Sequence, residues 1–256
     1  MSAGDDRIHF LGLGFDPFDE DELLATLDGR DAAQPFAYWV TPNVDHVVRL
    51  HEDKSPDRDE IWQAYYAAKW CSCDSRILAA LARRRGVIMP VVPGSDMTPT
   101  ILDKACRPGD RIAVVGGKRG TLAALAAKFP HLDIVQHEPP MGMRRNPAAM
   151  EAAADFVAAA RARFTFLAVG SPQQELLAQR ILRRGDSTGI GLCIGAAIEF
   201  VVGEMTRAPE IVQRLHLEWA FRLLSDPARL WKRYLITGPR IFGLVRKEEW
   251  RDPPGA

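Results

Sequence analysis

Two glutamines and a glutamate follow a sharp turn in the segment FTFLAVGSPQQE, residues 164–175. The apolar stretch predicts a buried strand, and the GSP triplet at 170–172 is typical of a tight turn that opens a helix, with the serine as cap. This explains the turn but not the polar groups of Gln173, Gln174 and Glu175. Open α/β sheets bind ligands at the carboxyl ends of their strands, so these groups are candidate ligand contacts.

Three other loops follow apolar stretches and carry polar groups of the same kind. They are VTPNVDH with Thr41, Asn43, Asp45 and His46; CSCDS with Asp74; and VVGGKRG with Gly116, Gly117, Lys118 and Gly120. The carboxyl ends of parallel strands meet at one edge of a sheet, so we expect all four loops to share one site.

The glycine loop could receive a phosphate on its backbone N–H groups, with Lys118 adding a positive charge. A plain tight turn explains its glycines equally well, because they lack the G-x-G-x-x-G spacing, and the chain has no Walker A motif. A dehydrogenase would depend on this loop alone, with Glu138 as a weak candidate for the ribose ligand.

Asp74 ends an apolar stretch, where burial and neighbouring groups can tune a carboxylate as a general base. Thr41 and Asn43 could hydrogen-bond a hydroxyl or a diphosphate oxygen. Each of the three could instead cap the helix that follows it. Metal binding has little support, since the six histidines form no metal motif and the DED at 19–21 precedes a predicted helix.

Composition is that of an ordinary globular protein, with 47% hydrophobic and 26% charged residues in 256. Thirty-three basic and thirty-three acidic residues cancel, which argues against a nucleic-acid partner. Four cysteines lack disulfide or zinc spacing and are expected as buried thiols in a cytoplasmic protein. We expect no signal peptide and no membrane span.

Apolar runs alternate with helical periodicity, which predicts an α/β fold with a Rossmann-like sheet flanked by helices. The predicted strands cover 7–13, 36–43, 68–75, 111–117, 132–138, 164–170 and 189–196. The predicted helices cover 44–53, 78–85, 97–106, 120–129, 147–163, 172–184 and 196–203.

The alternation stops after residue 203, so we predict a sheet domain over 1–203 and a helical appendage over 204–256. Its helices are amphipathic, with breaks predicted at Asp226-Pro227 and Gly238-Pro239. Residues 207–251 hold ten lysines or arginines against five acids. A basic amphipathic segment of this kind suits an anionic membrane surface, and its apolar faces could also form a homo-oligomer.

The order and spacing of four segments resemble the WecG/TagA/CpsF family, glycosyltransferase family 26. These segments are VGGKRG, FLAVGSPQQE, IGLCIGAAIEFVVGEMTRAP and LHLEWAFRLLSDPARLWKRYL. The resemblance implies a compact GT-E type fold and transfer of a sugar from a UDP-sugar to a polyprenyl-diphosphate-linked acceptor in cell-surface polysaccharide synthesis. It also implies inversion without a metal or other cofactor, by an enzyme peripheral at the inner face of the bacterial cytoplasmic membrane.

The resemblance also assigns roles to residues. Asp74 matches the proposed general base, although Ser75 replaces a family glycine and Asp45 is the alternative base; Thr41 and Asn43 match an active-site loop. Positions matched to substrate binding are Asp96, Gly116, Gly117, Lys118, Gly170, Gln173, Gln174, Glu175, Gly195, Glu199 and Arg207, with the tail arginines Arg214, Arg222, Arg229 and Arg233 as candidates for the donor diphosphate.

The donor sugar stays open between N-acetylmannosamine, its uronic acid, glucose and glucuronic acid, because one or two hydrogen bonds decide between them. A protein of another class is the alternative. It would bind a nucleotide sugar or polyprenyl phosphate without catalysis, its altered CDS loop having lost the base.

Overall fold

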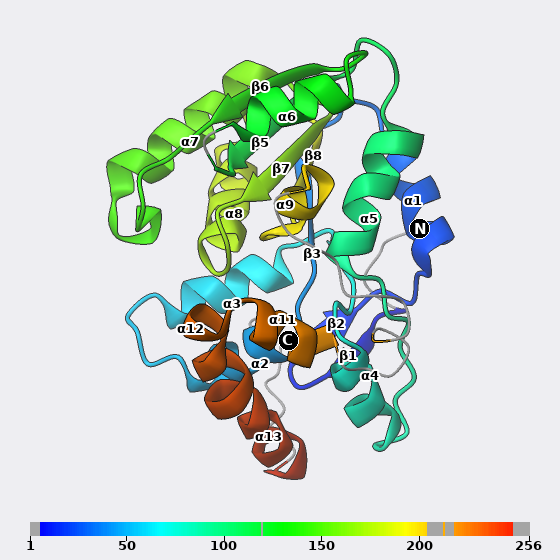
Figure 1. Cartoon of the computed structure of the whole chain (residues 1–256), viewed down its shortest axis with the longest axis vertical. Helices are drawn as coiled ribbons and strands as arrows, with labels where there is room; N and C mark the ends of the chain where they lie inside the picture. Colours follow the sequence, from blue (N-terminus) through cyan, green and yellow to red (C-terminus); the bar gives the residue numbers. More distant parts are fainter. Residues whose placement is uncertain (1–5, 119, 204–211, 213–217, 248–256) are drawn as a thin grey trace.

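A six-stranded parallel sheet forms the centre of the molecule (Figure 1). The computed structural model describes residues 6–118, 120–203, 212 and 218–247. The strand order is β4-β3-β8-β7-β5-β6. The bounds are β3 Ala37–Val40, β4 Trp70–Cys71, β5 Arg111–Gly116, β6 Asp133–His137, β7 Phe164–Ala168 and β8 Ile190–Cys193. The predicted α/β class and the six sheet strands after residue 30 are confirmed.

Helices cover both faces of the sheet because its strands are apolar on both sides. In β3, for example, Tyr38 and Val40 pack into one buried cluster while Ala37 and Trp39 pack into the other. The first cluster is covered by α2 Val44–Glu52, α3 Arg58–Tyr66, α4 Arg76–Arg83, α7 Pro147–Ala160 and α8 Gln173–Arg184. The second is covered by α1 Glu20–Asp28, α5 Gly94–Thr100, the π-helix η1 Ile101–Ala105, α6 Thr121–Lys128 and α9 Ala197–Val201.

The four central strands of the sheet send their chains alternately to its two faces at the carboxyl edge. β3 and β7 lead into α2 and α8 on one face, whereas β8 and β5 lead into α9 and α6 on the other. The loops therefore part along this edge, which is the condition for a ligand crevice in an open α/β sheet.

The stretch at 7–13 was predicted as a strand of this sheet. It instead forms most of a separate hairpin. β1 Ile8–Phe10 pairs antiparallel with β2 Leu13–Phe15. Leu11 and Gly12 have φ of 49° and 77°, so the chain turns back in the left-handed region. The helix α3 was also not predicted, because its aromatic-rich sequence runs into β4 without a glycine or proline between them.

Residues 218–247 form five helical segments. They are α11 Glu218–Ser225, α12 Pro227–Trp231, the π-helix η3 Lys232–Thr237, the 3-10 turn η4 Gly238–Arg240 and α13 Ile241–Lys247. The break at Asp226-Pro227 is confirmed. The break at Gly238-Pro239 is wrong: Gly238 keeps helical φ and ψ of −53° and −47°, and Pro239 lies in the first turn of η4, where its missing N–H does no harm.

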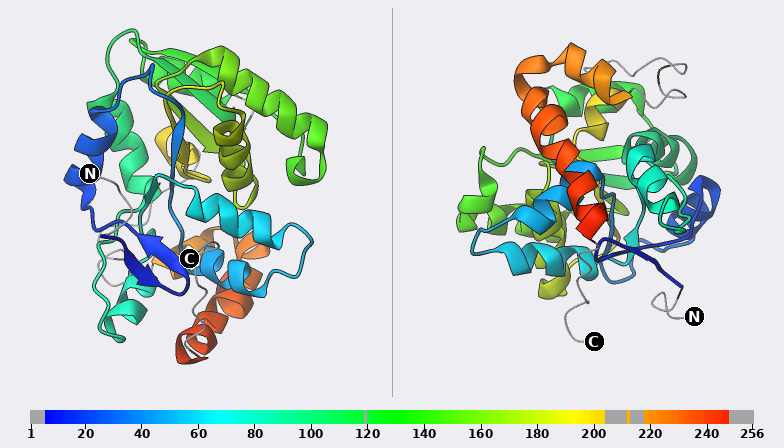
Figure 2. Two further views of the ribbon diagram at one scale, coloured as in Figure 1. Left: turned by 180° about the vertical axis from the view of Figure 1, so that it is seen from behind. Right: turned by 90° about the horizontal axis from the view of Figure 1, so that it is seen from below.

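These C-terminal helices lie beyond the carboxyl edge of the sheet and run across that end of the molecule (Figures 1 and 2). Ile241 and Leu244 of α13 are buried in the same apolar cluster as residues of α2 and α4. Arg240 also pairs with Glu52 of α2 at 2.5 Å. The helices thus cover the strand ends, while the division into domains at residue 203 stays a prediction.

Candidate active site

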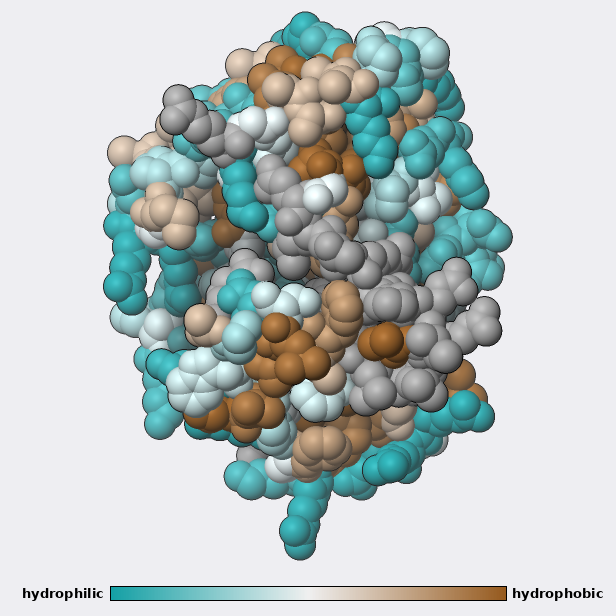
Figure 3. All heavy atoms as spheres, viewed as in Figure 1, coloured by the Kyte–Doolittle hydropathy of each residue, from teal (hydrophilic) through white to brown (hydrophobic). Residues whose placement is uncertain are grey.

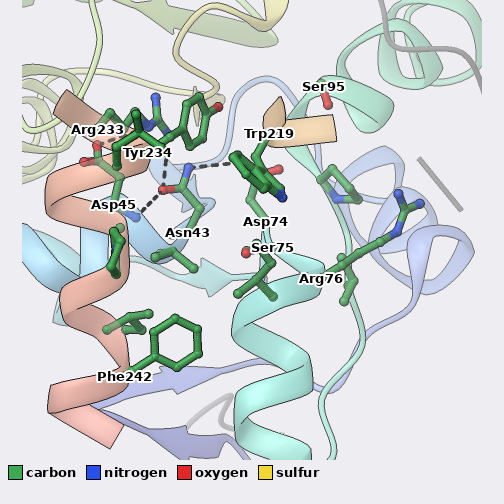
Figure 4. Close-up of a pocket in the computed structure, with 18 residues that line it drawn as sticks. Asn43, Asp45, Asp74, Ser75, Arg76, Ser95, Trp219, Arg233, Tyr234 and Phe242 are labelled. Carbon is green, nitrogen blue, oxygen red and sulfur yellow. Dashed lines mark hydrogen bonds and ion pairs between the residues drawn. The ribbon is translucent and has the colours of Figure 1, made fainter. Parts of the chain in front are cut away.

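A cavity of about 490 Å³ lies between the C-terminal helices and the loops that follow β3 and β4. Three of the predicted site residues line it: Asn43, Asp74 and Arg233 (Figure 4). Apolar side chains such as Ile77, Val91 and Phe242 form another part of the wall. The cavity therefore joins a polar group of side chains to an apolar surface.

Asn43 is both the cap of α2 and a member of the polar group. Its Oδ1 accepts hydrogen bonds from the backbone N–H groups of Asp45 at 3.1 Å and His46 at 3.3 Å. Its Nδ2 donates to Asp74 Oδ2 at 3.4 Å, and Arg233 Nη2 donates to Oδ1 at 3.4 Å. The two interpretations that the sequence left open for Asn43 are thus compatible.

Asp74 is not the cap of the helix after it. That role belongs to Ser75, whose Oγ accepts from the backbone N–H of Leu78 at 3.2 Å. The Asp74 carboxylate instead accepts from the backbone N–H of Gly94 at 3.2 Å as well as from Asn43. Two donors from different loops thus orient a half-buried carboxylate at the cavity wall.

Asp45, the alternative base, also lines the cavity but is held by two arginines. Its Oδ2 lies 3.2 Å from Arg49 Nη2 and 3.6 Å from Arg233 Nε. A carboxylate oxygen shared between two guanidinium groups is less available to accept a proton from a substrate. The two arginines therefore count against Asp45 as the base.

Thr41 lies behind the cavity wall. It is buried, and its hydroxyl donates to the backbone carbonyl of Cys193 at 3.1 Å, which ties the end of β3 to the end of β8. It also packs against Gly94, where an added Cβ would come within 3.3 Å of its Oγ1. The structure gives Thr41 a role in holding three loops together.

The glycine loop lies at a different part of the edge, outside the lining of this cavity. Gly116 has φ of 97°, and a Cβ there would come within 2.7 Å of the Ala168 carbonyl oxygen, so only glycine fits. Lys118 Nζ pairs with Glu199 Oε2 at 3.0 Å, which connects the loop to α9. Lys118 and Glu199, predicted separately, are thus brought together.

Two of the three polar groups that were predicted to face a ligand, Gln174 and Glu175, are buried in the structure. Gln173 is partly exposed, but its amide bonds to the Val169 carbonyl and the Arg144 N–H. Gln174 and Glu175 are only 1% and 0% exposed. Gln174 accepts from the N–H of Gly195 at 2.9 Å and donates to Glu175 at 2.8 Å. These two side chains hold the β8–α9 loop from inside the protein.

The serine of the same turn was expected to cap α8, and this is also wrong. The N-cap residue is Pro172, which makes no side-chain cap. The Ser171 hydroxyl lies 3.3 Å from the Tyr65 hydroxyl instead.

Burial makes Glu175 a test of how this interior network affects stability. Complete burial raises the pKa of its carboxyl above the usual value, so ionisation is opposed more strongly in the folded than in the unfolded chain. The native stability contributed by this group falls as pH rises from the unfolded pKa through the folded one. We expect the difference in free energy of unfolding between Glu175→Gln and wild type to favour the variant more at pH 8 than at pH 5. Urea unfolding measures this difference. An equal difference at both pH values would contradict this, and Glu60→Gln, which changes an exposed carboxyl, is the control.

Other predicted positions are spread along the edge. Gly170 and Gly195 have φ of 78° and 57° in turns after β7 and β8, and Asp96 accepts from Ser95 Oγ at 3.1 Å in α5. Arg207 and Arg214 lie outside the described residues, as do the side chains of Arg222 and Arg229. Arg233 is therefore the tail arginine whose side chain the structure places in the cavity.

Sequence reasoning missed the aromatic side chains of the cavity. Trp219 and Tyr234 both line it, with ring centroids 6.2 Å apart. Both residues lie in the tail segment used for the resemblance, from which only arginines were predicted as site residues.

Among the described residues, no group of three or more histidine, cysteine, aspartate or glutamate side chains could hold a metal ion. In the same part of the chain, no helix combines the length and apolarity that crossing a membrane requires. All four cysteines are buried free thiols, as predicted.

Fold and site together define a protein of the parallel α/β class with a polar cavity at the strand ends, covered by C-terminal helices. The chain belongs to the WecG/TagA/CpsF family of glycosyl transferases, whose family model matches residues 8–254. It is similar to an N-acetylglucosaminyldiphosphoundecaprenol N-acetyl-beta-D-mannosaminyltransferase of Bacillus spizizenii, at 28% identity over 162 residues. That match covers 62% of this chain and 60% of the relative.

Proposed function

We propose that this protein is an inverting glycosyltransferase that moves a sugar from a UDP-sugar to a polyprenyl-diphosphate-linked acceptor without a metal ion. Family membership supports the reaction class. The observation that carries the proposal is the Asp74 carboxylate, oriented by Asn43 and Gly94 in a cavity that Arg233 also lines. A base and a cation in one cavity are what a single displacement needs.

In this reaction Asp74 takes the proton of an acceptor hydroxyl while the hydroxyl oxygen forms a bond to the anomeric carbon of the donor. The bond from that carbon to the β-phosphate oxygen breaks, and UDP leaves with the electron pair from the opposite face. The configuration at the anomeric carbon inverts. Arg233 stabilises the charge that develops on the departing diphosphate through charge-assisted hydrogen bonds.

The sugar and acceptor of the Bacillus relative are the first to test here. Its name describes transfer of N-acetylmannosamine to N-acetylglucosaminyldiphosphoundecaprenol. The apolar wall of the cavity, with Ile77 and Phe242, supports an acceptor whose diphosphate is attached to a lipid. The loops at the ends of β5 and β8, including Lys118 and Glu199, remain the proposed position of the nucleotide.

Product analysis tests this function directly. The full chain is incubated with UDP-N-acetylmannosamine, its uronic acid, UDP-glucose or UDP-glucuronic acid and a short polyprenyl-diphosphate N-acetylglucosamine. We expect a disaccharide product with inverted configuration from one donor, with EDTA present. UDP binding without a product from any donor would contradict the proposed transfer reaction and support a non-catalytic binding protein.

The C-terminal helices also support peripheral attachment to the inner face of an anionic membrane. Leu224, Trp231, Leu235, Ile236 and Phe242 are exposed on them. Figure 3 shows apolar side chains gathered over this part of the surface. Aliphatic side chains that enter the interface of a bilayer, together with basic residues, hold a protein there.

Vesicle sedimentation measures this attachment. We expect Leu224→Ser with Ile236→Ser to weaken binding to phosphatidylglycerol vesicles roughly 10-fold or more, because each exposed aliphatic side chain that enters the bilayer contributes about 1 kcal/mol or more. Neither residue lines the cavity. Ile88→Ser is the matched control, since Ile88 is 76% exposed outside these helices. Equal loss in the control, or no loss in the double variant, would contradict attachment through the tail.

A further inference from the structure

A second cavity, of about 300 Å³, is lined by α2, α3, the 3-10 turn η2 Met143–Arg145, the β7–α8 turn and Thr237 of η3. Three arginines line it, namely Arg49, Arg58 and Arg144, against two carboxylates, Glu52 and Asp53. Sequence reasoning singled out none of these five residues. Their partners show which charges remain uncompensated.

Arg144 is engaged within the protein. Its Nε and Nη2 each lie 2.6 Å from an oxygen of Asp57, its Nη2 also bonds to Ser55 at 2.8 Å, and Asp53 lies 3.5 Å away. Two parallel bonds of this kind fix a guanidinium group firmly. Arg144 therefore compensates acids next to the cavity and forms part of its wall.

The other charges of the wall are balanced in the same way. Glu52 is held by Arg240 at 2.5 Å. Arg49 contacts Asp45 at 3.2 Å and donates to the backbone carbonyl of Ser171 at 3.0 Å. Burial lowers the pKa of His46, which leaves its ring neutral in its contact with the Tyr65 hydroxyl.

Arg58 is different, because within the described part of the chain it makes no side-chain hydrogen bond or ion pair. Its Nε is fully buried and lacks a hydrogen-bond partner there. It occupies the first position of α3, where the helix dipole disfavours a cation. A buried guanidinium nitrogen without an acceptor is unfavourable unless a ligand provides one.

We propose that this second cavity binds the diphosphate group of a substrate or product, with Arg58 as its main charged contact. A guanidinium group donates two parallel hydrogen bonds to phosphate oxygens, and an anion here would satisfy Arg58 and the start of α3 together. Ser171 and Thr237 add hydroxyl groups to the wall. The proposed function supplies the diphosphates to be tested, UDP and a lipid diphosphate, while the site itself follows from the charges.

The two cavities are connected through one carboxylate. Both are lined by α2 and η3, and Asp45 bonds to Arg49 of the second cavity and to Arg233 of the first. A diphosphate in the second cavity would thus lie next to the polar group around Asp74. This arrangement suits a diphosphate that belongs to the same reaction.

Calorimetric titration of the full chain tests the site without measuring transfer. The probes are UDP, uridine, farnesyl diphosphate and pyrophosphate, for wild type, Arg58→Gln and Arg183→Gln. Arg183 is an exposed arginine that pairs with Glu60 on α3, so its substitution removes the same charge outside the cavity.

We expect at least one diphosphate to bind wild type and Arg183→Gln alike, and to bind Arg58→Gln roughly 10- to 100-fold more weakly, the usual range for a hydrogen bond to a charged group. Farnesyl diphosphate as that probe assigns the site to the acceptor, whereas UDP as that probe would place the donor diphosphate in this cavity and not at Arg233. If Arg58→Gln binds every diphosphate as wild type does, or if wild type binds none, the proposal is overturned. Transfer that persists in such a case leaves the proposed function intact.

Discussion

Replacement of Asp74 by asparagine is expected to lower kcat of sugar transfer by about 10²- to 10⁴-fold, the usual contribution of a general base. The amide is nearly the same size and can still accept from the Gly94 N–H, so the loops after β3 and β4 keep their structure. Substrate binding should change little. Steady-state transfer with the donor identified by product analysis measures kcat, and thermal unfolding checks the fold.

Asp45→Asn is the matched control for this prediction. Asp45 lines the same cavity but is bonded to Arg49 and Arg233, so its loss should affect the position of the arginines more than proton transfer. We expect it to raise KM more than it lowers kcat. The reverse pattern, with near-normal turnover in Asp74→Asn and loss in Asp45→Asn, would move the base to Asp45.

The second large effect is expected from Arg233. Arg233→Gln should lower kcat by about 10² or more, because removing one preorganised donor from developing charge typically costs 10²- to 10³-fold. The structure places its guanidinium group within 3.4 Å of Asn43 and 3.6 Å of Asp45, at the polar part of the cavity. Transfer kinetics in detergent micelles measure this without dependence on vesicle binding.

Arg246→Gln separates this effect from a general loss of positive charge in the tail. Arg246 is an exposed residue of α13 that lines neither cavity, so its substitution changes the net charge equally outside both of them. We expect it to retain kcat within a few fold. Similar losses in both variants would show that Arg233 acts through the charge of the tail and not on the leaving group.

The layout of the sheet could be predicted from the sequence because its physical signals are strong. β5 and β7 are continuous apolar runs that end at glycine-containing turns, the pattern of strands covered on both faces. Asn146 and Pro147 likewise marked the start of α7. The same reasoning placed Asp74, Asn43 and Asp45 at one edge of the sheet, since the carboxyl ends of parallel strands meet there.

Side-chain direction could not be predicted in this way. The position at the end of β7 fixed the place of Gln173, Gln174 and Glu175, but successive helical residues point about 100° apart. Packing of α8 into the apolar cluster that it shares with α3 turned Gln174 and Glu175 inward. The interior bond to Gly195 depends on a loop that follows later in the chain, which a local pattern does not contain.

The second cavity could not be predicted from the sequence for a related reason. Arg58 and Arg144 are far apart in sequence, and neither lies in a segment that carried the resemblance. Their significance depends on which acids each of them meets, and this follows from tertiary contacts between α3 and η2.

Deletion of the tail is a common way to separate a membrane anchor from a catalytic domain, but here it removes part of the interior. Ile241 and Leu244 fill the apolar cluster shared with α2 and α4, and burying two aliphatic side chains contributes about 3 to 6 kcal/mol. A chain shortened before α13 would expose the apolar surface that α13 covers and would be prone to aggregate. An inactive truncated protein would therefore report misfolding as readily as lost anchoring, and point substitutions are the cleaner tool.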